Sequence, residues 1–235
     1  MNLSEFKKNL TAIILCGGRG ERLKPLTNTL PKPLIKIDNT EILSYILKHI
    51  KSYKVKNNLV LTGYKHDLIN KFVKKNFDTN IKCLYTGQKV DILKRIKKSL
   101  IHSKKFVLIC YGDTLININI NKLIKLHQKS KHTSTMSIFE TKTNFGIVKF
   151  DNNNVITKFS EKPNLNLWIN VGYFIFDRDE LIKFSDKFNT FKRLLDFLGK
   201  KSKIKVFKHK GKHITINSAL ELDEAKKKIK SFKNK

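Results

Sequence analysis

The chain has 235 residues, of which 40% are apolar, and its 49 Lys and Arg against 19 Asp and Glu give a formal net charge of +30 at pH 7. This length and apolar content exclude a disordered chain and favour one domain, residues 1–235, with a substantial core. No run approaches the roughly 18 apolar residues of a membrane-spanning helix, and residues 1–10 lead into no apolar stretch typical of a secretory signal. We therefore expect a cytoplasmic protein without a membrane partner.

The net charge and the spacing of the cysteines limit the classes of function that the sequence allows. Only five of the 49 basic residues are Arg, whereas proteins that read DNA grooves rely on the planar Arg fork. The excess of Lys accompanies an excess of Asn and Ile, which indicates A/T-rich codons and solvated lysines. We expect no specific nucleic acid as partner, although a non-catalytic basic nucleic-acid-binding protein stays an alternative. Three cysteines without a CxxC pattern predict neither a disulfide framework nor a zinc site.

Short apolar runs alternate with amphipathic stretches in the first two-thirds of the chain. Strands are expected at 11–16, 59–62, 81–85 and 106–111, and helices at 42–50, 68–77, 92–100 and 120–128. This order is typical of βαβ units, and strands that are apolar throughout predict a parallel sheet covered on both faces.

After residue 133 the pattern becomes richer in strands. Strands are expected at 134–139, 145–150, 155–159, 168–176, 204–207 and 213–216, and helices at 180–184, 190–198 and from 219 onward. We predict an α/β fold with a mixed, mainly parallel sheet and helices on both faces. A nucleotide-binding half, about 11–132, would share one continuous sheet with a substrate-binding half, about 133–235.

A glycine-rich segment, Leu-Cys-Gly-Gly-Arg-Gly-Glu-Arg-Leu, follows the first predicted strand. Its glycines let the backbone approach a triphosphate closely, and Arg22 can add a bidentate phosphate contact. The spacing matches neither the Rossmann fingerprint nor the Walker loop. A glycine turn needed only for packing is the alternative.

Two further positions carry charge beside this segment. In Pro-Lys-Pro-Leu the prolines present Lys32 rigidly, where it could neutralise charge on a transferring phosphoryl group. The strand at 106–111 ends in Gly-Asp, which places Asp113 at the edge where Mg²⁺ is held by a carboxylate and substrate phosphates. Asp113 as a simple helix or turn cap is the alternative.

The second half offers a Glu-Lys-Pro stretch and a glycine inside a strand. Glu161 and Lys162 end an apolar strand, so their charges are not expected in the core; an exposed ion pair worth about 0 to 1 kcal/mol is the alternative. Gly172 interrupts a strand, which often marks close approach of a ligand or another backbone.

The motifs GGRGERLKPLT, PKPLI, YGD, FSEKP and INVGYFIF, in this order, resemble the sugar-1-phosphate nucleotidylyltransferase family over about residues 11–229. The resemblance implies a Rossmann-like fold of the nucleotide-diphospho-sugar transferase type and Mg²⁺ as cofactor. It implies catalytic roles for Arg22, Lys32 and Asp113. The implied nucleotide-binding residues are Leu15, Gly17, Gly18, Gly20, Arg22, Gly87 and Gly112. The implied sugar-binding residues are Gly146, Glu161, Lys162, Asn170 and Gly172.

The resemblance is nearest to glucose-1-phosphate cytidylyltransferases, because Thr-Gly is followed by Leu-Lys-Arg at 86–95. It implies that an NTP, with CTP favoured, and a sugar 1-phosphate give an NDP-sugar for surface polysaccharide synthesis, by direct displacement of pyrophosphate. Asn217 stands where many members carry a second metal-binding Asp, so Asp113 and Asn217 are the implied metal ligands. Cytidylyl or guanylyl transfer to another metabolite, a heptose phosphate or a phosphocholine-like compound, stays an alternative. A homo-oligomer is possible, but the sequence does not determine the oligomeric state.

Overall fold

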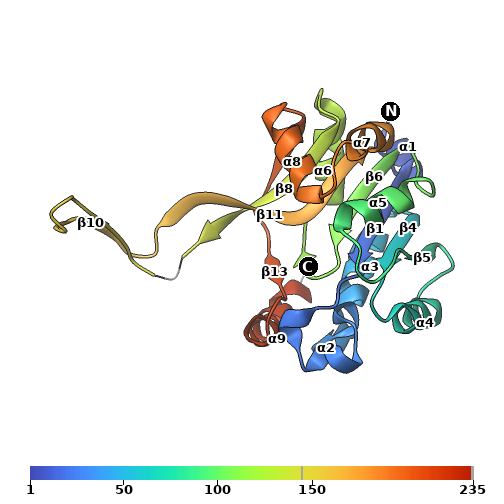
Figure 1. Ribbon diagram of the computed structural model, residues 1–235, viewed down its shortest axis with the longest axis horizontal. Helices are drawn as coiled ribbons and strands as arrows, with labels where there is room; N and C mark the ends of the chain where they lie inside the picture. Colours follow the sequence, from blue (N-terminus) through green and yellow to red (C-terminus); the bar gives the residue numbers. More distant parts are fainter. Residues whose placement is uncertain (144, 234–235) are drawn as a thin grey trace.

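The computed structural model describes residues 1–143 and 145–233, and a sheet of seven strands lies at its centre (Figure 1). Across the sheet the strands follow the order β12 (Ile204–His209), β8 (Ser134–Lys142), β11 (Asn164–Asp177), β6 (Phe106–Tyr111), β1 (Leu10–Cys16), β4 (Asn57–Thr62) and β5 (Ile81–Tyr85). In this sheet β11 runs antiparallel to both neighbours, and the other pairs are parallel. The predicted mixed, mainly parallel sheet is confirmed.

Helices cover both faces of the sheet because alternate strand residues point into two separate cores. On β1, Ala12 and Ile14 face one core and Ile13 faces the other, all at 0% exposure. The first core is closed by α1 (Leu3–Lys8), α3 (Ile42–Ser52), α4 (His66–Asn76), α6 (Ile120–Lys129) and α9 (Ala219–Lys233). The second core is closed by α5 (Ile92–Leu100), α7 (Arg178–Ser185) and α8 (Phe191–Lys200).

Residues before the first strand, for which the sequence offered no account, form α1. Asn2 caps this helix by accepting a hydrogen bond from the backbone N–H of Glu5. The Phe6 ring stacks on Phe106 with ring centroids 4.0 Å apart. The helix is short, and its single buried side chain attaches it to β6.

Several short elements, most of which the sequence did not predict, connect the layers of the fold. Between β1 and α3 lie η1 (Glu21–Leu23), α2 (Leu26–Thr29), η2 (Lys32–Leu34), β2 (Lys36–Ile37) and β3 (Thr40–Glu41). Beyond the end of β6, β7 (Thr114–Ile116) pairs antiparallel with β13 (His213–Thr215). This pairing brings the segment before α9 to the carboxyl end of β6.

A two-stranded hairpin of β9 (Ile147–Phe150) and β10 (Ile156–Ser160) projects far from the rest of the molecule (Figure 1). Both strands were predicted, although the prediction placed them in the continuous sheet. They instead form a separate two-stranded sheet beyond the ends of β8 and β11. We call residues 145–163 the arm and the remainder of the described chain the body.

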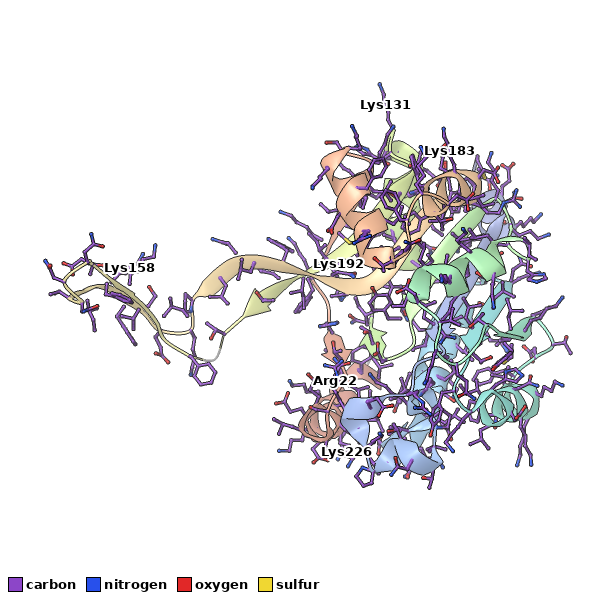
Figure 2. All side chains as sticks on the ribbon, viewed as in Figure 1. Arg22, Lys131, Lys158, Lys183, Lys192 and Lys226 are labelled. Carbon is purple, nitrogen blue, oxygen red and sulfur yellow. The ribbon has the colours of Figure 1, made fainter. Side chains whose placement is uncertain are left out.

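Basic side chains are distributed over the whole molecule. The lysines labelled in Figure 2 lie on the arm (Lys158), near the middle (Lys192) and at opposite ends of the body (Lys131 and Lys226). Such a distribution favours solvated lysines over a single nucleic-acid-binding strip. None of the helices in residues 1–143 and 145–233 combines the length and apolar character needed to cross a membrane.

Candidate active site

A cavity of about 410 Å³ lies at the carboxyl ends of β1 and β6, where parallel strands present their following loops at one edge. Most of the predicted nucleotide, catalytic and metal positions line it. They are Leu15, Gly17, Gly18, Gly20, Arg22, Lys32, Gly112, Asp113 and Asn217. Residues up to 202 positions apart in the chain therefore meet at one site.

The four glycines that line the cavity have different roles. A Cβ on Gly18 would meet nothing within 4 Å, so a ligand can approach this stretch of backbone closely. Gly20 adopts a left-handed φ of 66°, and a Cβ there would lie 3.0 Å from the Thr27 side chain. A Cβ on Gly17 would overlap the Arg95 guanidinium, and one on Gly112 would overlap the carbonyl oxygen of Leu15. Packing therefore requires Gly17 and Gly112, whereas Gly18 leaves the cavity open.

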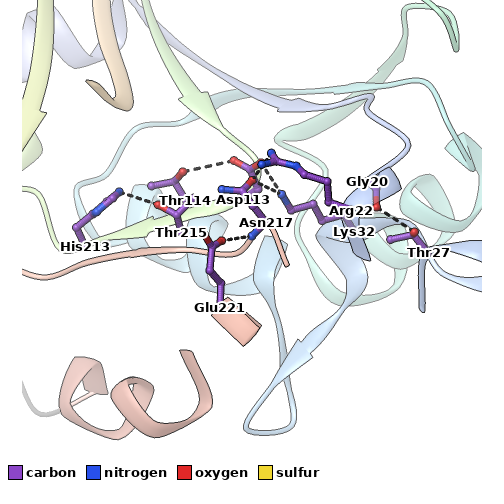
Figure 3. A network of polar contacts seen from close by, with 10 residues as sticks. All are labelled: Gly20, Arg22, Thr27, Lys32, Asp113, Thr114, His213, Thr215, Asn217 and Glu221. Carbon is purple, nitrogen blue, oxygen red and sulfur yellow. Dashed lines mark hydrogen bonds and ion pairs between the residues drawn. The ribbon is translucent and has the colours of Figure 1, made fainter. Parts of the chain in front are cut away.

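Lys32 and Asp113 form an ion pair in the cavity, shown in Figure 3. The Lys32 Nζ lies 2.6 Å from the Asp113 Oδ2, and the Lys32 side chain is 11% exposed. Pro31 and Pro33 flank the lysine, and Pro33 lies within the short 3₁₀ turn η2. The rigid presentation predicted from the sequence therefore aims the lysine directly at the carboxylate.

Asn217 joins this pair from the other end of the chain. Because β13 pairs with β7, the Ile216 N–H donates to the Asp113 carbonyl oxygen at 3.2 Å. The Asn217 Oδ1 accepts from the Lys32 Nζ at 3.1 Å and from the Arg22 Nη2 at 3.0 Å. A neutral oxygen thus lies between two cations, beside the carboxylate of Asp113 (Figure 3).

Arg95 is a site residue to which the sequence analysis gave no role. It is 5% exposed, and its guanidinium lies against the glycine loop. Its six hydrogen-bond acceptors are the carbonyl oxygens of Gly17, Thr62, Gly87, Gln88 and Val90 and the hydroxyl of Thr86. The available signal was a rare Arg in a Lys-rich chain, on the helix face that also carries Leu93, Ile96 and Leu100.

These contacts join the loops that follow β1, β4 and β5. The Arg95 Nη2 donates to Gly17 at 3.1 Å, and the Arg95 Nη1 donates to Gly87 at 2.6 Å. Gly87 has a left-handed φ of 107°. Although it was predicted at the nucleotide, the contact that the structure gives its carbonyl group is the one with Arg95.

A second cavity, of about 380 Å³, adjoins the first and shares Ile92 and Tyr111 with it. Asn170 lines this cavity and donates to the Tyr111 hydroxyl at 3.3 Å. Burial raises the pKa of the Tyr111 phenol above its ordinary value, so the hydroxyl stays protonated at neutral pH. Gly172, with a φ of 75°, lies against the Tyr111 ring, and a Cβ there would overlap this side chain.

Three predicted sugar-binding residues lie on the arm, away from the other site residues. Glu161 and Lys162 form an ion pair of 3.9 Å in which both side chains are more than 60% exposed. A Cβ on Gly146 would overlap the Phe159 ring and lie 3.1 Å from the Glu161 Oε2. Within one chain these residues form the exposed ion pair that was the alternative interpretation, and Gly146 packs inside the arm.

Comparison with known proteins finds relatives over nearly the whole chain. The family model described as nucleotidyl transferase matches residues 11–216. A probable glucose-1-phosphate cytidylyltransferase of Bacillus subtilis is 31% identical, covering 93% of this chain and 95% of its own. A D-glycero-alpha-D-manno-heptose 1-phosphate guanylyltransferase of Campylobacter jejuni is 30% identical over 72% of this chain and 77% of its own. The crystal structure of HddC from Yersinia pseudotuberculosis superposes with a TM-score of 0.71 at 23% identity, covering 93% of this chain and 99% of that one.

Proposed function

We propose a specific reaction for this chain, which belongs to the nucleotidyl transferase family. The chain is a nucleotidyltransferase that acts on a sugar 1-phosphate, and in the proposed reaction CTP is the nucleotide donor. The products are a CDP-sugar and pyrophosphate. The observation that carries the proposal is the Lys32–Asp113 ion pair, which lines the same cavity as the glycine-rich loop after β1.

The proposed triphosphate position follows from the free backbone and the charges around it. Gly18 offers unobstructed backbone, and Arg22 and Lys32 supply two cations on the same side of the cavity. Arg22 is suited to a bidentate phosphate contact, and Lys32 acts as a point charge. An anionic ligand would take over the contacts that Asn217 now makes with both cations.

The proposed chemistry is a single displacement at phosphorus. An oxygen of the sugar 1-phosphate attacks the α-phosphorus of the nucleotide, and a new P–O bond forms there. The bond from the α-phosphorus to the bridging oxygen breaks, and pyrophosphate leaves with that electron pair. Lys32 and Arg22 stabilise the negative charge that develops on the phosphates, so the side chains contribute by positioning and electrostatics.

A divalent metal ion is implied by the family, and the residues at the cavity fit one. Asp113 offers a carboxylate that is 34% exposed, and Asn217 offers an amide oxygen beside it. Mg²⁺ is commonly held by one or two carboxylates together with substrate phosphates. We propose that Asp113 and Asn217 hold Mg²⁺, which supplies positive charge to the reacting phosphates when bound. The Lys32 ammonium also offsets the negative charge of the Asp113 carboxylate.

The sugar is proposed to bind in the adjoining cavity. Tyr111 and Ile92 line both cavities, so a nucleotide in one and a sugar in the other would be neighbours. Asn170 and the protonated Tyr111 hydroxyl offer hydrogen bonds suited to sugar hydroxyl groups.

CTP is favoured by the Bacillus subtilis relative, which is similar over 93% of this chain. The Campylobacter jejuni relative favours guanylyl transfer to a heptose phosphate as the second candidate.

A substrate panel tests the proposal. The protein is incubated with Mg²⁺, one of CTP, GTP, UTP, ATP or dTTP, and either glucose 1-phosphate or a heptose 1-phosphate, and pyrophosphate release is measured. CTP with glucose 1-phosphate is expected to give the highest kcat/KM. A preference for GTP with the heptose phosphate would replace the cytidylyl assignment, and no release with any pair would contradict the proposed function.

A further inference from the structure

The segment between β13 and α9 holds Asn217 by its backbone as well as by its side chain. The Asn217 backbone N–H donates to the Glu221 Oε2, on the first turns of α9 (Figure 3). The preceding N–H, that of Ile216, donates to the Asp113 carbonyl oxygen at 3.2 Å. Two consecutive N–H groups are therefore held, one by the main chain of the catalytic carboxylate residue and one by the Glu221 side chain.

Glu221 also takes part in the cap of α9, with one difference from the usual arrangement. Ser218 directly precedes the helix, and its Oγ accepts from the Glu221 N–H at 3.2 Å. This Ser-x-x-Glu spacing is that of a capping box, in which the glutamate side chain returns to the N–H of the capping residue itself. Here the carboxylate accepts from Asn217, one residue earlier. The helix has its serine cap, and the glutamate contact is made with a residue of the candidate active site.

The direction of the Asn217 side chain depends on this backbone contact. Asn217 lies between the last residue of β13 and the first residue of α9. Its Oδ1 accepts from the Lys32 Nζ at 3.1 Å and from the Arg22 Nη2 at 3.0 Å. Hydrogen bonds weaken steeply away from their preferred distance and angle, so a rotation of the backbone at Asn217 would move the amide oxygen out of this position.

We propose that Glu221 is a positioning residue for the reaction. Its carboxylate holds the Asn217 backbone so that the amide oxygen is presented beside Asp113, on the metal-binding side of the cavity. The inference rests on the proposed function, in which Asp113 and Asn217 hold Mg²⁺. Glu221 is not among the described residues that line the two cavities, so it acts through Asn217 and not on a substrate.

The chemistry of an amide ligand explains why such support matters in this chain. A neutral amide oxygen can bind Mg²⁺, but it supplies no charge of its own to the ion. The Asn217 oxygen also has two cations beside it, Lys32 and Arg22. A ligand with so little electrostatic attraction for the metal depends on being held in the right place, and residues that orient a metal ligand typically change metal affinity about 10- to 100-fold when they are replaced.

The test compares two substitutions of Glu221, with the substrate pair that the wild type turns over fastest. Glu221→Ala removes the acceptor, and the Mg²⁺ concentration for half-maximal pyrophosphate release is expected to rise at least about 10-fold. Glu221→Gln keeps an acceptor oxygen, so its Mg²⁺ requirement should stay within about threefold of the wild-type value. A wild-type requirement in Glu221→Ala would overturn the proposal. An equal rise in both variants would also overturn it, because charge and not the hydrogen bond would then be responsible.

Two controls separate positioning from the stability of α9. Ser218→Ala removes the helix cap and leaves the Glu221 carboxylate in place, so Tm should fall by about 2–4 °C while the Mg²⁺ requirement stays near that of the wild type. Glu224→Ala removes an exposed ion pair with Lys228 on the same helix and should change neither quantity. A Mg²⁺ requirement that follows Tm across all the variants would overturn the proposal and leave Glu221 as a stabiliser of the helix.

A measurement without turnover observes the contact directly. In protein that carries ¹⁵N-labelled asparagine, the backbone amide signal of Asn217 is identified by its loss in Asn217→Asp. Hydrogen bonds to a carboxylate are short and strong, so this amide proton should resonate downfield in the wild type and move upfield in Glu221→Ala. Circular dichroism confirms that the variant is folded. The same chemical shift in both proteins would overturn the proposal.

The two proposals fail in different ways. If the wild type releases no pyrophosphate with any substrate pair, the proposed function fails, and with it the role of Glu221 in the reaction, while the amide signal still decides whether Glu221 holds Asn217. If the wild type is active and Glu221→Ala has the same Mg²⁺ requirement, the proposed function stands and the positioning role fails.

Discussion

The body cavity and the arm both carry residues that the family resemblance assigns to substrate, and they differ in burial and in contacts. In the cavity, Lys32 is 11% exposed as a side chain and contacts two groups from distant parts of the chain. On the arm, Lys162 is 64% exposed, and the ion-pair partner given for it is the adjacent residue. A preorganised electrostatic site needs charges held by several contacts. The cavity meets this requirement within one chain, and the arm would meet it only against a second surface.

Removing the Lys32 ammonium should have the largest effect. Lys32→Met is expected to lower kcat by about 10²- to 10³-fold, the usual cost of losing one electrostatic contact to the transition state. Lys36→Met is the matched control, because Lys36 is an exposed lysine nearby that pairs with Glu41 at 3.8 Å. Pyrophosphate release measures both variants, and wild-type turnover in Lys32→Met would exclude this residue from the mechanism.

Arg95 should act on nucleotide binding rather than on the chemical step. Lysine cannot reproduce contacts to six acceptors, so Arg95→Lys should loosen the segment from Thr86 to Val90. We expect the KM for CTP to rise about 10-fold and discrimination against the other nucleotides to weaken, with the KM for sugar 1-phosphate unchanged. Arg178→Lys, remote from the cavity and bound to the carbonyl oxygen of Ser103, is the control. Equal losses for both substrates would indicate a purely structural role.

A smaller effect is expected when Asn217 is changed to Asp. The new carboxylate would lie between Lys32 and Arg22, which now donate to the amide oxygen, so its charge would be compensated. A second carboxylate should strengthen metal binding. The Mg²⁺ concentration for half-maximal rate should fall several-fold, roughly as expected for one added charged ligand. An unchanged or higher Mg²⁺ requirement would place the metal away from Asn217.

The smallest effect concerns pH and the strand that positions Asn217. Burial, and then the charge of His209, lowers the pKa of His213 on β13 to about 4, from an ordinary value of 6.5. Because the unfolded chain binds this proton more readily, stability should decrease as the pH falls from about 6.5 to 4. Replacing His213 by Gln should reduce this slope in urea unfolding measured across that range. An equal slope in both proteins would contradict the assignment.

The strands of the body were predictable because a strand that is covered on both faces leaves a continuous apolar run in the sequence. The run from Phe106 to Tyr111 is apolar throughout, as a strand covered on both faces must be, and its predicted bounds are those observed. Lys32 and Asp113 were identified because prolines and a strand end restrict where they lie. Helix α1 was missed because its position depends on Phe6 stacking on Phe106, a contact that no local pattern records.

The arm and Arg95 show what sequence patterns leave out. The apolar residues of β9 and β10 are typical of strands in a covered sheet. In this structure the two strands pair with each other, and Phe150 and Phe159 are exposed. Glu161 and Lys162, which the family resemblance assigned to the sugar phosphate, lie on the arm and outside the two cavities. Arg95 connects loops that follow three different strands, so its contacts depend on the order of strands in the sheet.

We propose that Asp113 is the carboxylate around which the nucleotide reaction is organised. The direct measurement is the rate of pyrophosphate release by wild type and Asp113→Asn with saturating CTP and glucose 1-phosphate, as a function of Mg²⁺ concentration. The variant is expected to be folded, to lose about 10²-fold or more in kcat, and to require more Mg²⁺. A variant with wild-type turnover and an unchanged Mg²⁺ requirement would contradict the account.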